Sequence, residues 1–282
     1  MRLARFRTAD GAERLGRVEG DGVVDVTEAA GGASLTAILS RLDELGPALA
    51  SAAGETRALA DVTLLNPIDN PQKVLAIGMN YAEHAAEAAQ AGIPTPTSQF
   101  WFNKQVSSLN DPFGEIVKPI ESDALDYEVE LGVVIGMRTR RIAKADALSA
   151  VAGYVVANDV SVRDWLQKLS PTFILGKGWD THGPLGPWLT TADEIADPHV
   201  LRMTLTVNGE VRQDHLTDDM IYDIADQISY LSTVMTLMPG DVLLTGTPQG
   251  IGAPTGNFLK PGDVVRAEIE GLGAIENRVV AE

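Results

Sequence analysis

Residues 125–136 read LDYEVELGVVIG and carry the period of a β-strand. Side chains alternate across a strand, so the apolar residues of this stretch would lie on one face. The other face would carry Asp126, Glu128 and Glu130. At roughly 3.3 Å per residue, Glu128 and Glu130 would lie about 7 Å apart, close enough to share one cation. A solvated acidic face is the alternative, because acidic side chains are mostly exposed.

Short apolar segments bounded by Gly and Pro continue on both sides of this stretch. They include KVLAIG at 73–78, VAGYVVANDVSV at 151–162 and DVLLTG at 241–246. Two helical patterns interrupt them: YAEHAAEAAQA at 81–91, with Asn80 as a candidate N-cap, and a pattern of apolar residues at helical spacing that follows Thr217. Because no regular alternation of strands and helices is visible, we predict an α+β fold that is mainly β.

The first 66 residues form a small N-terminal domain in this interpretation. They combine short β-like pieces with Gly-rich turns and a helix-like run from Leu35 to Ala52. Pro67 and Pro71 follow within the stretch NPIDNPQK, and prolines restrict the residues before them, which is typical of a linker. We therefore place the main domain at residues 72–282.

Composition narrows the function. The 282 residues carry a formal charge of −17 and no cysteine. The negative charge argues against nucleic acid or an anionic membrane as partner, and the lack of cysteine excludes thiolate metal sites and thiol nucleophiles. The N-terminal residues lack the apolar run of a secretory signal. We expect a cytoplasmic protein whose partner is a small molecule.

A third carboxylate follows the apolar run 151–157. Asp159 would stand at the exit of a buried strand, where it could complete an oxygen-ligand set with Glu128 and Glu130. Mg²⁺ or Mn²⁺ suits three carboxylates, Ca²⁺ is a further candidate, and Zn²⁺ is less suited without thiolates. The alternative is that Asp159 only bonds a turn.

Two further groups could do chemistry. His84 and Glu87 are spaced i, i+3 on the first helical pattern, so Glu87 could accept from one imidazole nitrogen and leave the other free as a base. Lys177 lies between two glycines, where a cation could stabilise an enolate or oxyanion. The alternatives are a surface contact for the pair and a solvated lysine. The segment TGTPQGIG at 245–252 offers a hydroxyl and backbone N–H groups, but it lacks the residues of a P-loop.

Taken in order, these segments resemble the fumarylacetoacetate hydrolase family. The matching pieces are GMNYAEHAAE, FWFNK, LDYEVELGVVIG, GYVVANDVSVRD, GKGWDTHGPLGP, VNGEVRQ, LMPGDVLLTGTPQGIG and FLKPGDVV. The resemblance implies a mixed β-roll catalytic domain, a homodimer and a divalent Mg²⁺ or Mn²⁺. It implies metal ligands at Glu128, Glu130 and Asp159, a catalytic dyad at His84 and Glu87, an active-site lysine at Lys177, and substrate contacts from Lys104, Arg163, Gln167 and Thr247.

One position departs from the family pattern. The family often has a glutamine seven residues after the aspartate ligand, and this chain has Leu166 there, with Gln167 displaced by one. Either a local bulge restores Gln167 to the site, or the polar contact is missing and substrate preference has changed.

The resemblance supports several reactions on a metal-bound 2-oxo acid. Our first hypothesis is hydrolysis of a C–C bond in a 2,4-dioxo acid similar to an acylpyruvate, giving pyruvate and a carboxylic acid. His84, oriented by Glu87, would activate water, and the metal with Lys177 would stabilise the pyruvate enolate. The alternatives are decarboxylation of an oxaloacetate-type acid and isomerisation or tautomerisation of an unsaturated 2-hydroxy or 2-oxo dicarboxylate. A non-catalytic cation-binding module is least favoured, because it would not require the dyad and the lysine.

Overall fold

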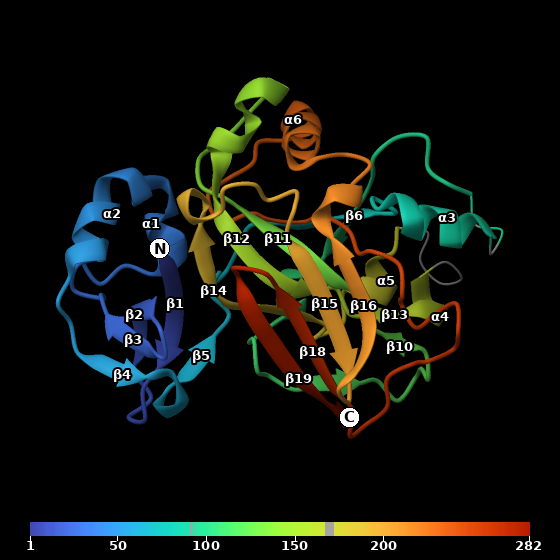
Figure 1. Ribbon diagram of the computed structural model, residues 1–282, viewed down its shortest axis with the longest axis horizontal. Helices are drawn as coiled ribbons and strands as arrows, with labels where there is room; N and C mark the ends of the chain where they lie inside the picture. The colour runs from blue at the N-terminus through green and yellow to red at the C-terminus, as the bar shows by residue number, and fades with distance from the viewer. Residues whose placement is uncertain (91, 93, 167–171) are drawn as a thin grey trace.

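A long mixed sheet runs through the molecule (Figure 1). The computed structural model describes residues 1–90, 92, 94–166 and 172–282. Within them, the sheet has the order β4 (Thr56–Ala58), β3 (Gly22–Asp25), β2 (Glu13–Glu19), β1 (Arg2–Arg7), β14 (Gly183–Thr191), β12 (Val151–Asn158), β11 (Val129–Ile135), β17 (Val242–Leu244), β6 (Val74–Gly78) and β7 (Phe100–Lys104), with β5 (Thr63–Leu65) on β1 and β8 (Leu109–Asn110) on β14.

A second sheet covers one face of the first (Figure 1). Its order is β16 (Glu210–Leu216), β15 (Arg202–Val207), β18 (Val264–Ile269), β19 (Gly273–Ala281) and β9 (Ile116–Lys118). Buried and exposed residues alternate along β15 and β18, because one face of this sheet meets the core and the other meets water. A short pair, β10 (Leu125–Asp126) with β13 (Ser161–Val162), lies next to the start of β11.

The central strands β11 and β12 are buried at every residue. Residues of the second sheet pack on one face, and residues of the N-terminal helices pack on the other. Strands that are covered on both faces have continuous apolar sequences rather than alternating ones. This explains the apolar sequences VVI at 133–135 and the run that starts at Val151. The predicted mainly β fold is confirmed. The alternative of a solvated acidic face is excluded, because Asp126, Glu128 and Glu130 are all buried.

The helices are short and surround the sheets. They are α1 (Leu35–Ile38), α2 (Leu42–Ser51), α3 (Ala82–Gln90), α4 (Arg163–Leu166), α5 (Ile174–Lys177) and α6 (Ile224–Val234). Single 3₁₀ turns are η1 (Leu39–Arg41), η2 (Leu59–Asp61), η3 (Val106–Ser108), η5 (Ala192–Glu194) and η6 (Thr217–Asp219), and a longer one is η4 (Lys144–Ala150). No helix in the described ranges combines the length and apolar character that crossing a bilayer requires.

Two details of the helices differ from prediction. Asn80 does not cap α3, because its side chain bonds Thr245 O, Tyr222 O and Tyr222 N–H instead. The N–H of Glu83 donates to Asp219 from another part of the chain, a capping partner that local sequence cannot reveal. The second predicted helix begins at Ile224 rather than after Thr217, with the Asp223 carboxylate accepting from an N–H of its first turn.

The N-terminal strands are part of the main sheet. β1 pairs with β14 of the remaining chain, and residues of α1 and α2 share a core with β11, β12 and β17. The predicted helix-like run from Leu35 to Ala52 is present as α1, η1 and α2 in succession. The division of the chain between residues 66 and 72 remains a prediction, because strands on both sides of it belong to one sheet.

Candidate metal centre and active site

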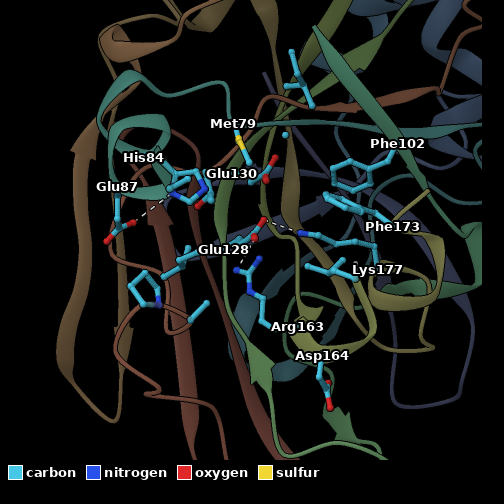
Figure 2. A pocket seen from close by; sticks show the side chains of 18 residues that line it. Met79, His84, Glu87, Phe102, Glu128, Glu130, Arg163, Asp164, Phe173 and Lys177 are labelled. Carbon is cyan, nitrogen blue, oxygen red and sulfur yellow. Dashed lines mark hydrogen bonds and ion pairs between the residues drawn. The ribbon is translucent and has the colours of Figure 1, made fainter. Parts of the chain in front are cut away.

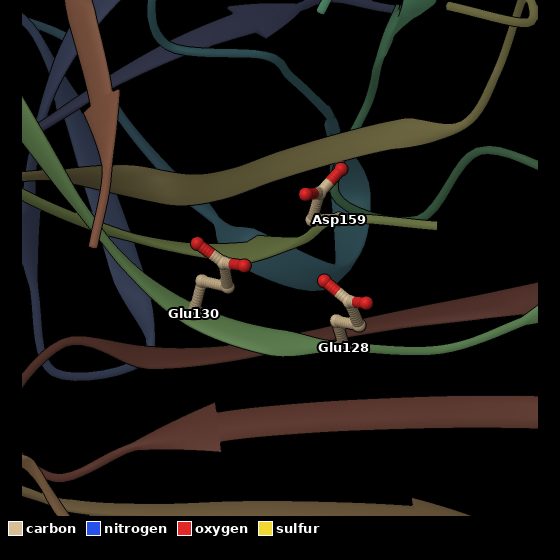
Figure 3. Close-up of side chains that lie close together, drawn as sticks. All are labelled: Glu128, Glu130 and Asp159. Carbon is tan, nitrogen blue, oxygen red and sulfur yellow. The ribbon is translucent and has the colours of Figure 1, made fainter. Parts of the chain in front are cut away.

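Three buried carboxylates face one another at the start of β11 and the end of β12 (Figure 3). Oxygen atoms of Glu128, Glu130 and Asp159 all lie within 4.8 Å of one another. Glu130 belongs to β11, Glu128 precedes that strand, and Asp159 follows β12. The structure therefore brings together the three residues that the sequence suggested as ligands, and Asp159 does more than bond a turn.

The local backbone explains this convergence. Glu130 stands opposite Ala157 in the antiparallel pair of β11 and β12, so the two chain segments remain adjacent at the carboxylates. Glu128 leaves the regular ladder: its N–H donates to the Asn158 side chain at 3.0 Å, and its carbonyl accepts from the Asp159 N–H at 2.9 Å. This exchange holds Glu128 and Asp159 side by side without strand pairing.

Two cations contact the carboxylates, and Lys177 bridges two of them. Lys177 Nζ lies 2.8 Å from Glu128 Oε2 and 2.7 Å from Asp159 Oδ2, and Arg163 Nη2 lies 2.6 Å from Glu128 Oε1. Burial opposes ionisation of Glu128, but Lys177 and Arg163 outweigh it and lower its pKa to about 2. Burial also opposes the charge of Lys177, but Asp159 and Glu128 raise its pKa above the ordinary value. The solvated lysine considered above is therefore excluded.

Glu130 has a different environment. Its Oε2 accepts from the Gly246 N–H at 2.8 Å, and no ion pair to it is found among the described residues. Burial, and then the charges of Asp159 and Glu128, raise its pKa well above the ordinary value. A divalent cation would relieve this repulsion, since hard cations prefer carboxylate oxygens. The donor set therefore fits Mg²⁺ or Mn²⁺.

Lys104, for which the resemblance implies a substrate contact, lies away from the cavity. Its side chain is fully buried behind the cluster, where Nζ lies 2.7 Å from Asp159 Oδ1 and donates to Lys177 O at 2.7 Å and Val160 O at 3.2 Å. It does not line the cavity in front of the carboxylates. Lys104 therefore holds Asp159 and the end of α5 in place.

A cavity of about 370 Å³ opens onto the cluster (Figure 2). This volume is within the range of small-molecule sites. His84 and Glu87 line it from α3, with His84 Nδ1 3.5 Å from Glu87 Oε2. This is a long contact, but catalytic hydrogen bonds are often long before substrate binds. The structure thus places both residues of the predicted dyad on the same cavity as Glu128 and Glu130.

The remaining wall of the cavity is mostly apolar. Phe102 and Phe173 pack with ring centroids 5.7 Å apart, and Leu166 lies with them along the lining. Arg163 and Thr247 also line the cavity, as the sequence suggested for substrate contacts. Gln167 lies outside the described residues. The remaining lining residues are Ile77, Gly78, Met79, Ala88, Asp164, Lys177, Ile251, Ala253 and Pro254.

Glycines beside Lys177 serve packing rather than ligand approach. A Cβ on Gly176 would lie 2.5 Å from Leu166 Cδ2, and one on Gly178 would lie 2.7 Å from Ile174 O. Two N–H groups of the 245–252 segment are likewise engaged within the chain. Gly246 N–H is bonded to Glu130, and Gly252 N–H donates to Asp126 Oδ1 at 2.7 Å.

Two functional candidates were not recognised from sequence. Asp126 is fully buried and accepts from Arg163 Nε at 2.7 Å, which aims the guanidinium at Glu128. Gln213, on β16, is also fully buried and bonds the backbone of Val129. The signal for Asp126 was its place on the same strand face as the ligands. No comparable signal marks Gln213, which lies in a strand of mostly polar residues.

Comparison with known proteins decides the family. Residues 73–280 match the family model described as fumarylacetoacetate (FAA) hydrolase C-terminal. The chain belongs to the fumarylacetoacetate hydrolase family. Residues 1–67 match a second model, described as Rv2993c-like, N-terminal. The family resemblance of the sequence is therefore confirmed, and the first match covers all residues of the carboxylate cluster and the dyad.

Relatives within the fumarylacetoacetate hydrolase family have different activities. The chain is 42% identical to human mitochondrial oxaloacetate tautomerase FAHD2A, over 99% of this chain and 92% of that protein. It is similar to the crystal structure of maleylpyruvate hydrolase from Sphingobium sp. SYK-6 in complex with manganese(II) ion and pyruvate, with 34% identity, a TM-score of 0.85 and coverage of 100% and 99%.

A third relative catalyses an isomerisation. The crystal structure of 5-carboxymethyl-2-hydroxymuconate delta-isomerase from Mycobacterium smegmatis is 34% identical, with a TM-score of 0.80 and coverage of 100% of this chain and 99% of that one. The fold of these relatives matches the mixed sheets described above. The chain is an enzyme of this family, and its relatives include hydrolases, isomerases and tautomerases.

Proposed function

We propose that this enzyme hydrolyses a C–C bond in a 2,4-dioxo acid similar to an acylpyruvate. The products are pyruvate and a carboxylic acid. The observation that carries the proposal is that His84 and Glu87 open onto the same cavity as the acidic cluster. Hydrolysis of a 2,4-dioxo acid needs a base for the attacking water and a metal site for the 2-oxo acid, and this cavity offers candidates for both.

In this reaction, water adds to the C4 carbonyl and the C3–C4 bond breaks. His84 accepts the proton of the attacking water, and Glu87 holds the imidazole through its contact with Nδ1. The electron pair of the broken bond forms the enolate of pyruvate, and protonation of C3 then completes the product. Lys177 and Arg163 place positive charge at the cluster, where the negative charge of the enolate develops.

Glu128, Glu130 and Asp159 would hold the divalent ion. When bound, Mg²⁺ or Mn²⁺ polarises carbonyl oxygens and stabilises negative charge on them. Its charge would also offset, locally at the site, the repulsion that the chain's charge of −17 exerts on an anionic substrate. The relative that contains manganese and pyruvate supports this assignment, because pyruvate is itself a 2-oxo acid.

Keto–enol tautomerisation of oxaloacetate is a second candidate. It is favoured by the human relative, which matches nearly the whole chain and is named an oxaloacetate tautomerase. Tautomerisation needs proton transfer without an attacking water, and His84 could supply it at C3 of the acid. The two reactions share the carboxylate cluster and differ in what His84 deprotonates.

A substrate panel separates the two reactions. Acylpyruvates, oxaloacetate and hydroxymuconate-type diacids are each offered with Mg²⁺ or Mn²⁺ and again after EDTA. Hydrolysis predicts metal-dependent release of pyruvate from an acylpyruvate, whereas tautomerisation predicts decay of the ultraviolet absorbance of enol-oxaloacetate without cleavage.

Variants then assign the roles of residues. Glu128→Ala should abolish every activity, because it removes a ligand that all of these reactions share. His84→Ala should abolish hydrolysis, because the only other candidate bases among the described residues of the cavity are carboxylates and Lys177. Full pyruvate release by His84→Ala would contradict the assignment of the base.

A further inference from the structure

The strand β16 has its polarity reversed around one residue. Gln213 is fully buried, whereas Val211 is 58% exposed and Leu216 is 42% exposed. Amides are mostly exposed and valine and leucine are mostly buried in proteins. A strand that buries its glutamine and exposes its apolar residues breaks the usual rule, and such exceptions occur where function requires them.

A β-bulge produces this reversal. Leu205 of β15 pairs with Gln213, but the next residue, Thr206, pairs with Val211, so Arg212 is an extra residue in β16. The bulge turns Val211 outward and leaves Gln213 directed inward, next to the loop 247–250. That loop comes so close that a Cβ on Gly250 would lie 2.2 Å from Arg212 O. Bulges are common beside active sites, where they redirect a side chain.

The amide of Gln213 completes a closed ring of hydrogen bonds. Its Oε1 accepts from the Val129 N–H at 3.0 Å, and its Nε2 donates to Thr247 Oγ1 at 2.9 Å. Thr247 Oγ1 then donates to the Val129 carbonyl at 2.9 Å. Nε2 also donates to Pro248 O at 2.9 Å. Both backbone polar groups of Val129 are therefore bound to side chains from other segments.

Val129 is the residue between the two glutamates of the cluster. Its peptide groups connect directly to Glu128 and Glu130, so the ring fixes the backbone from which both side chains extend. Glu128 lies just before β11, and its own N–H bonds the Asn158 side chain rather than a strand partner. Gln213 thus connects the second sheet to the backbone of the carboxylate cluster.

We propose that Gln213 is a positioning residue for divalent-metal binding, acting through the backbone of Val129 on Glu128 and Glu130. The inference rests on the metal site of the proposed function. Groups that orient metal ligands without touching the metal contribute about 10- to 100-fold to affinity or activity. Gln213 touches neither the cavity nor the carboxylates, so its effect is on their placement.

The test is titration of the metal-free protein with Mn²⁺ by calorimetry. Gln213→Met keeps the volume of the side chain and removes all of its hydrogen bonds, and we expect Mn²⁺ affinity to fall about 10- to 100-fold. Asn277→Leu is the matched control. Asn277 is an equally buried amide in the same sheet, and its Nδ2 donates to Gly114 O at 2.8 Å, away from the cluster. This control should lose stability but keep wild-type affinity.

A second pair of variants breaks the ring from its other side. Thr247→Val removes the hydroxyl between Gln213 and the Val129 carbonyl, and we expect it to weaken Mn²⁺ binding as well. Thr247→Ser keeps the hydroxyl and should bind Mn²⁺ as the wild type does. These variants decide the question if Gln213→Met does not fold.

Two results overturn the inference. The first is Mn²⁺ affinity within twofold of wild type in Gln213→Met, or in Thr247→Val if only that variant folds. The second is an equal loss of affinity in Asn277→Leu. If the wild-type protein itself binds no Mn²⁺, both the proposed metal site and the role of Gln213 are refuted. If the wild type binds Mn²⁺ and the variants bind it with the same affinity, only the role of Gln213 is refuted.

Discussion

Removing the charge of Lys177 should make the enzyme depend on metal for its stability. Lys177 Nζ contacts Glu128 Oε2 at 2.8 Å and Asp159 Oδ2 at 2.7 Å, and all three side chains are at least nine-tenths buried. Removing one partner of a buried ion pair costs about 3–5 kcal/mol when the remaining charge is left uncompensated. Arg163 still pairs with Glu128 and Lys104 still pairs with Asp159, so we expect a loss at the lower end of this range. In a chain of this length, the metal-free Lys177→Met variant should melt roughly 5–10 °C below wild type.

Metal should restore much of this loss. A divalent ion held by the same carboxylates supplies the positive charge that the variant lacks. In the variant, the ion also binds without competition from the Lys177 ammonium for the carboxylate oxygens. Ligand binding stabilises by an amount that grows with affinity, about 2.7 kcal/mol at 100 times Kd. We therefore expect Mn²⁺ to raise the melting temperature of Lys177→Met more than that of wild type.

The assay is thermal unfolding in EDTA and in Mn²⁺, with Lys73→Met as the matched control. Lys73 Nζ also pairs with a buried carboxylate, Asp241 Oδ2 at 2.7 Å, outside the cluster. Its loss should lower the melting temperature without any added response to metal. The reasoning is refuted if metal-free Lys177→Met melts with wild type, or if Mn²⁺ stabilises the two variants equally.

Three further predictions concern pH and geometry. Burial lowers the pKa of His182 to about 4, so the folded state favours the neutral imidazole. The stability of the folded state is therefore unaffected by this group above pH 6.5, and falls by on the order of 3 kcal/mol as the pH falls from 6.5 to 4. Urea unfolding across this range should show a flatter pH profile for His182→Gln, and an unchanged profile would contradict it. The raised pKa of Glu130 predicts that Mn²⁺ binding releases a proton and weakens as pH falls. Calorimetry in two buffers of different ionisation enthalpy measures the number of protons released, and a value of zero would be inconsistent with a protonated Glu130. Arg163→Lys cannot span Asp126 and Glu128 together, so kcat/KM should fall about 10- to 100-fold, and kinetics within twofold of wild type would count against this role.

Local patterns in the sequence predicted the site better than its surroundings. The alternation around Glu128 and Glu130 and the position of Asp159 after an apolar run suggested that the three carboxylates meet, because strand geometry is local. The family resemblance then favoured this over a solvated face and a turn. The i, i+3 spacing placed His84 near Glu87 for the same reason. These are short-range rules that need no knowledge of which segments meet.

Errors arose where a distant segment decides the environment. No local pattern shows that Lys104 and Lys177 are buried. Both contact Asp159, which lies far along the chain from Lys104. Asn80 has the residue type of an N-cap, but Tyr222 and Thr245 use its amide. Gln213 could not be assigned because its partner Val129 lies in another sheet. Burial and long-range pairing, rather than residue type, fixed these roles.

In the proposed function, Glu128, Glu130 and Asp159 together hold one divalent ion that receives a 2-oxo acid. Crystals soaked with Mn²⁺ and oxalate, a mimic of the pyruvate enolate, test it most directly through an anomalous difference map. We expect a single manganese peak bounded by the three carboxylates, with oxalate bound to it inside the cavity. An absence of manganese at these carboxylates, or manganese there with no oxalate, would show that they do not form this site.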